Sequence, residues 1–242
     1  GLGVFVPAIT LTHWLMTGIT HAVPFGPVIE PAVNTIMYAT IGAGVVILAG
    51  LAPAYVTAHR PRRNGVLLEN LVYLTSSVPG ILIAIGLLQL IIGLKRVAPL
   101  DMGTTSAWQL LQSGGLLLIL GYVLRFLSQA YAALKPAFLR LDTRQDESAR
   151  ILGASPWRRW KTITFPALKP GVAAAYTLIF LSIAKELPIT LMLVPLGKTT
   201  LAYRVFDAQQ ESALPDVGLT GIALLTIALM LQWAIIRWRS DV

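Results

Sequence analysis

The stretch LDTRQDESARILGASPWRRWKTITFPALKP (Leu141–Pro170) is a polar interruption in a chain that is otherwise apolar and nearly uncharged. It holds four closely spaced charged residues and then three further bases, namely Arg144, Asp146, Glu147, Arg150, Arg158, Arg159 and Lys161. Because apolar runs flank the segment on both sides, we expect it to face water between two membrane spans. The partner that it meets in the water then determines what the chain does.

A short helix and a corner are predicted at the start of this segment. Thr143 with Asp146 three residues later fits a capping box, in which two side chains satisfy backbone N–H groups at a helix start. The run 144–152 is compatible with a helix. Gly153 is a natural stop because glycine adopts a left-handed backbone without a Cβ clash. We therefore expect a water-exposed helix that ends at a glycine corner.

A second helix is predicted directly after the corner. Ser155 can cap it, and Pro156 is tolerated in a first helical turn, where its missing N–H is not needed. Two tryptophans beside three cations in this helix are typical of a helix that lies in the headgroup layer. We expect the chain to descend into the bilayer only after Pro166 and Pro170.

The composition excludes an ordinary soluble domain. Hydrophobic residues make up 55% of the 242 residues and charged residues only 12%, so the chain is expected to be surrounded by membrane lipid. The sequence contains no cysteine. A disulfide framework, a thiolate nucleophile and a cysteine-based metal site are therefore excluded.

The fold class that we expect is an all-α membrane protein with about six transmembrane helices in one domain, residues 1–242. Each apolar run approaches the ~20 residues that cross a bilayer core. The runs are at about 1–20, 32–58, 69–93, 113–134, from about 171, and 217–236, with the polar loop at about 134–169. The third run is broken near Pro79. The first begins without methionine or a basic flank, so we expect the later part of a longer polypeptide; a natural mature terminus is the alternative.

The positive charge follows the loops. Thirteen lysines and arginines lie in the turn 59–65, the loop 134–169 and the C-terminal end, against four in the opposite loops. By the positive-inside rule, the polar loop and the C-terminus are expected in the cytoplasm. The net charge of +8 is thus explained by topology, and we expect no nucleic-acid partner.

Lys185 and Glu186 are ionisable residues inside the fifth apolar run, and Pro188 breaks the helix directly after them. Ionisable groups within a span usually face a bundle interior or a water-filled path. We expect these three residues to line or gate a translocation path. The alternative is a structural ion pair with Arg125 or another span, and Arg125 itself is expected to reach toward the cytoplasmic face or pair internally.

Other chemistries find little support in the sequence. Gly197-Lys198-Thr199 ends like a phosphate-binding loop, but the glycine required five residues earlier is Met192. We therefore expect no ATP on this chain. The three histidines are scattered, with no helical pair beside a glutamate, so no metal site and no catalytic residue are predicted.

The spacing of the polar interruption resembles the cytoplasmic signature of permease subunits of binding-protein-dependent ABC importers: Glu-Ala-Ala, three residues, Gly, nine residues, Ile-x-Leu-Pro. The matching residues here are Glu147, Ser148, Ala149, Gly153, Ile163, Phe165 and Pro166. Ser148 and Phe165 depart from the signature but keep the local size or apolar character. Further runs, Lys185–Phe206 and Ser77–Leu88, look like ferric-iron importer permeases, so the resemblance covers most of residues 60–240.

This resemblance implies a MetI-like permease fold with a cytoplasmic coupling helix that is seated on an ABC ATPase dimer. The residues implied in ATPase coupling are Asp146, Glu147, Ser148, Ala149, Gly153 and Ala154. ATP and Mg would be held by the ATPase, and this chain would bind no cofactor. The chain would lie in a bacterial cell inner membrane as a multi-pass protein.

The resemblance also implies partners at the outer face and beside the chain. A periplasmic substrate-binding protein would dock on the loops 94–112 and 197–216, with Arg204, Asp207 and Glu211 as contacts. A second permease half or subunit would complete the path, and in this group the two halves are often fused. The expected substrate is Fe(III), while related permeases carry thiamine, phosphonates, polyamines or sulfate.

Three alternative classes remain to be weighed. An ATP-independent transporter would use Lys185 and Glu186 as an ion or proton relay, and it would leave the cytoplasmic helix–glycine–helix unexplained. A membrane enzyme would need a nucleophile or metal cluster that the sequence does not supply. The simplest alternative is an ordinary basic loop with a chance glycine.

Overall fold

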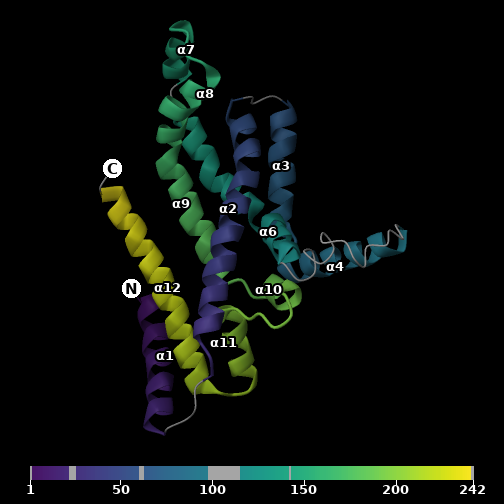
Figure 1. The fold of residues 1–242 in the computed structure, drawn as a ribbon, viewed down its shortest axis with the longest axis vertical. Helices are drawn as coiled ribbons and strands as arrows, with labels where there is room; N and C mark the ends of the chain where they lie inside the picture. The colour runs from purple at the N-terminus through teal and green to yellow at the C-terminus, as the bar shows by residue number, and fades with distance from the viewer. Residues whose placement is uncertain (1, 22–25, 60–62, 98–114, 142, 241–242) are drawn as a thin grey trace.

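The computed structural model describes residues 2–21, 26–59, 63–97, 115–141 and 143–240, and every regular element within these ranges is a helix (Figure 1). In chain order they are α1 (Leu2–Thr20), α2 (Ile29–His59), α3 (Arg63–Ser77), α4 (Gly80–Val97), α6 (Leu116–Leu139), α7 (Thr143–Ile151), α8 (Pro156–Arg159), the π-helix η1 (Trp160–Thr164), α9 (Phe165–Ala184), α10 (Pro188–Leu193), α11 (Leu201–Gln210) and α12 (Leu214–Ser240).

Four stretches are long and apolar enough to cross a membrane: α2, α6, the run from Pro156 to Ala184, and Leu214–Ile235 within α12. The bent pair α3 and α4 makes a fifth if it counts as one span. The predicted all-α membrane bundle is confirmed, although the described residues supply four or five spans by this test rather than six. The first expected span forms α1, which lies beside α12 (Figure 1). Gly218 allows this close approach, because a Cβ there would lie 2.6 Å from the Leu11 carbonyl oxygen.

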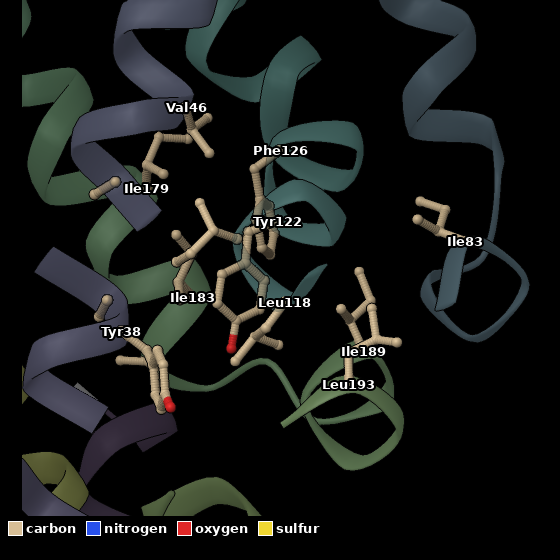
Figure 2. Packing of buried hydrophobic residues seen from close by; sticks show 14 of the residues in the cluster. Tyr38, Val46, Ile83, Leu118, Tyr122, Phe126, Ile179, Ile183, Ile189 and Leu193 are labelled. Carbon is tan, nitrogen blue, oxygen red and sulfur yellow. The ribbon is translucent and has the colours of Figure 1, made fainter. Parts of the chain in front are cut away.

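The main core lies where α2, α6 and α9 pack together and where α10 closes one end. Figure 2 shows Tyr122 of α6 meeting Ile183 of α9 in the middle of this buried cluster. The Tyr122 hydroxyl and the Thr190 hydroxyl are 2.7 Å apart, so the phenol is satisfied inside the apolar core. The outer surface is apolar as well, with Leu48 of α2 69% exposed. Such a surface fits hydrocarbon rather than water.

The predicted break near Pro79 is confirmed. α3 ends at Ser77, α4 begins at Gly80, and the two helices meet at 99°. Proline lacks the N–H that would continue the helix. Gly80 leaves room for the segment that contains Glu186, because a Cβ at Gly80 would lie 3.1 Å from Glu186 Oε1. α4 therefore projects sideways from the bundle (Figure 1).

The polar interruption forms a helix, a corner and a longer helical run, partly as predicted. The helix α7, the corner at Gly153 and the cap at Ser155 are present, and Ser155 Oγ accepts from Arg158 N at 3.3 Å. The side chains of Thr143 and Asp146 lie outside the described set, so the capping box stays a prediction.

The expectation of a separate helix that ends before Pro166 and Pro170 is wrong, while the point at which this run enters the bilayer stays a prediction. α8, η1 and α9 follow one another without a gap from Pro156 to Ala184. The π turn accommodates the approach to Pro166, because Phe165 N bonds five residues back to the Trp160 carbonyl. Pro170 lies inside α9, where helices in membranes tolerate proline.

Candidate functional site

The first candidate site is the elbow, defined as residues 143–164, whose α7 end projects beyond the ends of α2 and α3 at one end of the bundle (Figure 1). Glu147 and Ser148 are exposed on α7, while Ala149 and Ala154 are half-buried. The side chain of Asp146 lies outside the described set. The elbow thus presents the signature residues to the surroundings of the bundle.

The corner of the elbow is a Schellman motif. Gly153 N donates to the Arg150 carbonyl at 3.0 Å, and Ala154 N donates to the Ala149 carbonyl at 3.0 Å. Gly153 has φ +76°, and a Cβ built there would meet nothing within 4 Å. The glycine is therefore required by the left-handed backbone and not by crowding.

Two residues at the tip of the elbow were missed by the sequence reasoning. Ile151 and Leu152 are each 86% exposed, directly before the corner. Large apolar side chains that stay exposed at the end of a projection mark a candidate interaction surface. The signal was present in the sequence as an apolar pair between Arg150 and Gly153, within an otherwise polar helix.

The second candidate site is the break between α9 and α10, which contains Lys185, Glu186 and Leu187. Glu186 is 8% exposed, and its carboxylate caps α10. Glu186 Oε2 accepts from Ile189 N at 3.0 Å and from Thr190 N at 3.1 Å. The buried charge is thus satisfied by backbone N–H groups freed at the helix start.

Arg125 occupies a comparable place at the other break. Its Nη1 donates to the Ser76 carbonyl at 3.3 Å and lies 3.5 Å from the Val78 carbonyl. These oxygens are exposed by the end of α3, and a cation is favoured at a helix C-terminus. No salt bridge joins Arg125 to Glu186 among the described residues, although the two charges interact at longer range, so the structural pairing of the alternative is not a direct ion pair.

One cavity joins the two breaks. This central cavity has a volume of about 610 Å³, and its lining includes Ser76, Gly80, Arg125, Lys185, Glu186 and Pro188. Lys185 is exposed, and the described residues offer it no ion pair. The three residues predicted for a path or gate are therefore together in one cavity, and transport through it stays a prediction. Within the described residues, no three potential ligands of the His, Cys, Asp and Glu types gather as a metal site.

The residues predicted to contact a binding protein lie at the opposite end from the elbow, on α11 and just after it (Figure 1). Arg204 is already engaged, since its Nη2 lies 2.9 Å from Asp216 Oδ2 and its Nη1 lies 3.7 Å from Asp207 Oδ2. Glu211 is exposed. Most of the loop 94–112 falls outside the described residues, so its predicted docking role is not addressed by the structure.

Comparison of this chain with known proteins finds similar transport proteins both by sequence and by fold. The sequence pattern of the family described as "Binding-protein-dependent transport system inner membrane component" matches residues 46–237. The Fe(3+)-transport system permease protein FbpB 2 of Haemophilus influenzae is 29% identical over 88% of this chain and 41% of its own length. A protein named as the 2-aminoethylphosphonate transport system permease PhnV of Salmonella typhimurium is also 29% identical, over 70% of this chain and 59% of its own. This chain thus spans 41% of the first relative and 59% of the second.

Solved structures share the fold as well, and two of them serve as examples. An inward-facing form of the MetNI methionine ABC transporter has a TM-score of 0.60 at 16% identity, over 87% of this chain and 93% of that chain. A bacterial alginate ABC transporter in complex with a periplasmic protein has a TM-score of 0.70 at 16% identity, over 96% and 86% of the two chains. At this identity the likeness is one of fold alone.

Proposed function

This chain belongs to the family of binding-protein-dependent transport system inner membrane components, and from that membership we propose that it forms part of the substrate path of an ATP-driven importer in a bacterial inner membrane. The observation that carries the proposal is the elbow: a projecting helix with a Schellman corner, an exposed Glu147 and an exposed apolar tip. A separate ATPase dimer, which holds ATP and Mg, would bind this elbow in the cytoplasm.

The helical run after the elbow supports a mechanical link. Pro156 to Ala184 is 29 residues long, which corresponds to ~43 Å at 1.5 Å per residue. One end of this run adjoins the corner, and the other ends beside Lys185 in the central cavity. A sideways push on the elbow would tilt the run and change access to the cavity. This is a rigid-body route to alternating access.

Fe(III) delivered by a periplasmic binding protein is the first substrate that we propose, because relatives named for ferric transport match most of this chain. A phosphonate is the second, and one observation favours it. The central cavity presents Arg125 and Lys185, while the carboxylate of Glu186 is held by backbone N–H groups. Such a lining suits an anion, such as a phosphonate, better than a bare trivalent cation. If Fe(III) is the substrate, it would therefore pass as a complex with anionic ligands.

The test of the coupling role is Glu147→Lys in the full-length protein, assembled with its ATPase in liposomes. A lysine should repel the partner surface that accepts the glutamate, so substrate-stimulated ATP hydrolysis should fall to the unstimulated level. Ser148→Ala is the matched control, because it restores the alanine of the family signature and should leave coupling unchanged. Normal coupling in Glu147→Lys would reject the docking role.

The substrate test uses the same liposomes loaded with ATP. Uptake of Fe(III) and of 2-aminoethylphosphonate should each be measured in the presence of the cognate binding protein. Uptake that persists without the ATPase would instead favour an ATP-independent transporter, in which Lys185 and Glu186 relay ions.

A further inference from the structure

A basic pocket lies where the elbow meets the ends of α2 and α6. Its volume is about 610 Å³, and the charged residues in its lining are Arg140, Glu147, Arg150 and Arg159. Among the described residues of the lining, three arginines stand against one glutamate. Trp160 also lines this pocket. The guanidinium groups therefore come from three separate places in the chain and line one hollow.

An apolar groove runs beside this pocket, between α2 and α9. Its volume is about 360 Å³, and its lining has no charged residue: Gly44, Ile47, Leu48, Leu51, Trp160, Phe165, Leu168, Val172 and Tyr176. Gly44 has no atom within 4 Å of where a Cβ would stand. Its two neighbours in the same helix differ, because a Cβ at Gly42 or Gly50 would crowd α6 or α9. Gly44 thus opens the groove, whereas Gly42 and Gly50 serve helix packing.

The pocket and the groove adjoin at Trp160, which lines both. On α2 the groove is lined from Gly44 to Leu51, and the pocket by Tyr55 and His59. These positions recur every three or four residues and so follow one face of the helix. The distance from Gly44 to Tyr55 along α2 is ~16 Å. The apolar groove and the basic pocket therefore follow one another along one face of α2, with the basic pocket nearer the elbow.

We propose that a phospholipid with an anionic headgroup occupies this site. Arginine guanidinium groups bind phosphate oxygens in a forked geometry, and the net positive pocket favours an anionic headgroup over a zwitterionic one. The acyl chain lies along the groove, and Trp160 marks the boundary, where tryptophan is favoured in membranes. A soluble phosphate compound would fill the pocket and leave the groove bare.

A lipid at this position would affect how the elbow is held. The headgroup contacts Arg159 of α8 and Arg140 beyond α6, while the chain lies against α2. The lipid therefore holds the start of the helical run against the bundle. This inference rests on the two cavities and does not depend on the substrate or on ATP.

The experiment compares lipid retention by the purified full-length protein, measured by native mass spectrometry after exchange into phosphatidylglycerol or phosphatidylcholine. The unaltered protein should retain phosphatidylglycerol preferentially. Arg140→Gln combined with Arg159→Gln should weaken that retention roughly tenfold or more. Arg158→Gln is the matched control, because Arg158 neighbours Arg159 but lines neither cavity, and it should retain the lipid. Equal retention by the double variant and the control would overturn the proposal.

The groove is tested separately. Gly44→Leu should fill it and reduce phosphatidylglycerol retention, and Leu48→Trp offers a second way to fill it from an exposed position. Inorganic phosphate serves as the soluble probe, in a competition assay against the lipid. Loss of retention in either groove variant, with weak competition by phosphate, supports the lipid. If both groove variants retain the lipid as well as the unaltered protein does, and phosphate abolishes that retention, the site is a soluble-phosphate pocket and the lipid proposal is rejected. No lipid preference in the unaltered protein, as expected if protein covers the groove, would also reject it.

Discussion

The elbow and the α9–α10 break each carry a glutamate, Glu147 within α7 and Glu186 between two helices, and the fold treats the two carboxylates differently. Glu186 is buried and accepts hydrogen bonds from Ile189 N and Thr190 N, so its charge is satisfied within the chain. Glu147 is exposed and makes no ion pair with any described residue. A charge that the fold has satisfied is needed for stability, whereas a charge that the fold leaves outward is available to a partner. This difference predicts which substitutions will unfold the protein and which will uncouple it.

The largest effect on stability is expected from Glu186→Ala. The change leaves two backbone N–H groups at the start of α10 without an acceptor in a buried setting, so unfolding free energy should fall by about 3 kcal/mol. Thermal unfolding in detergent measures this. Glu186→Gln should lower the free energy of unfolding by less, because the amide oxygen of the glutamine can still accept a hydrogen bond from these N–H groups. Glu211→Ala removes an exposed carboxylate and should change stability by less than about 0.5 kcal/mol. Equal stability of Glu186→Ala and Glu211→Ala would show that the buried carboxylate of Glu186 contributes no more to stability than an exposed one.

A smaller effect is expected from Gly153→Val, which acts on the elbow through its backbone. The left-handed φ of +76° costs an L-residue about 1–2 kcal/mol, so the corner should lose its shape while the bundle stays folded. Substrate-stimulated ATP hydrolysis should drop, and global thermal unfolding should change little. Gly153→Asn is the matched variant, because asparagine adopts this conformation more readily. Full coupling in Gly153→Val would show that the corner geometry is not required.

A small effect on stability is also expected from Lys185→Met, which tests the comparison within the α9–α10 break itself. Lys185 follows the end of α9 and lines the central cavity without an ion pair among the described residues. Removing its charge should alter unfolding free energy by less than about 1 kcal/mol, while uptake falls several-fold and the ATPase still co-purifies. Uptake at the unaltered level would assign Lys185 to the helix end rather than to the path.

Local signals predicted the elbow well because its geometry depends on neighbours in sequence. The stop at Gly153 and the cap at Ser155 follow from backbone freedom and a serine oxygen, and both are present. Two local signals misled. Pro166 and Pro170 were interpreted as the end of an interfacial helix, but a π turn and the start of α9 accommodate the first and the helix interior accommodates the second. Proline removes a hydrogen bond without dictating that the helix must end.

The amino-acid sequence alone determined that this protein is a helical membrane protein, where its polar elbow lies, and that the third span is broken at Pro79. These properties depend on hydropathy and on residues adjacent in the chain. Only the tertiary structure decided that α3 and α4 meet at 99°, that Arg125 binds the carbonyls at the end of α3, and that Glu186 caps α10 beside Gly80. Whether a charge is satisfied depends on backbone groups that distant segments bring to it, and no spacing within one segment contains that information.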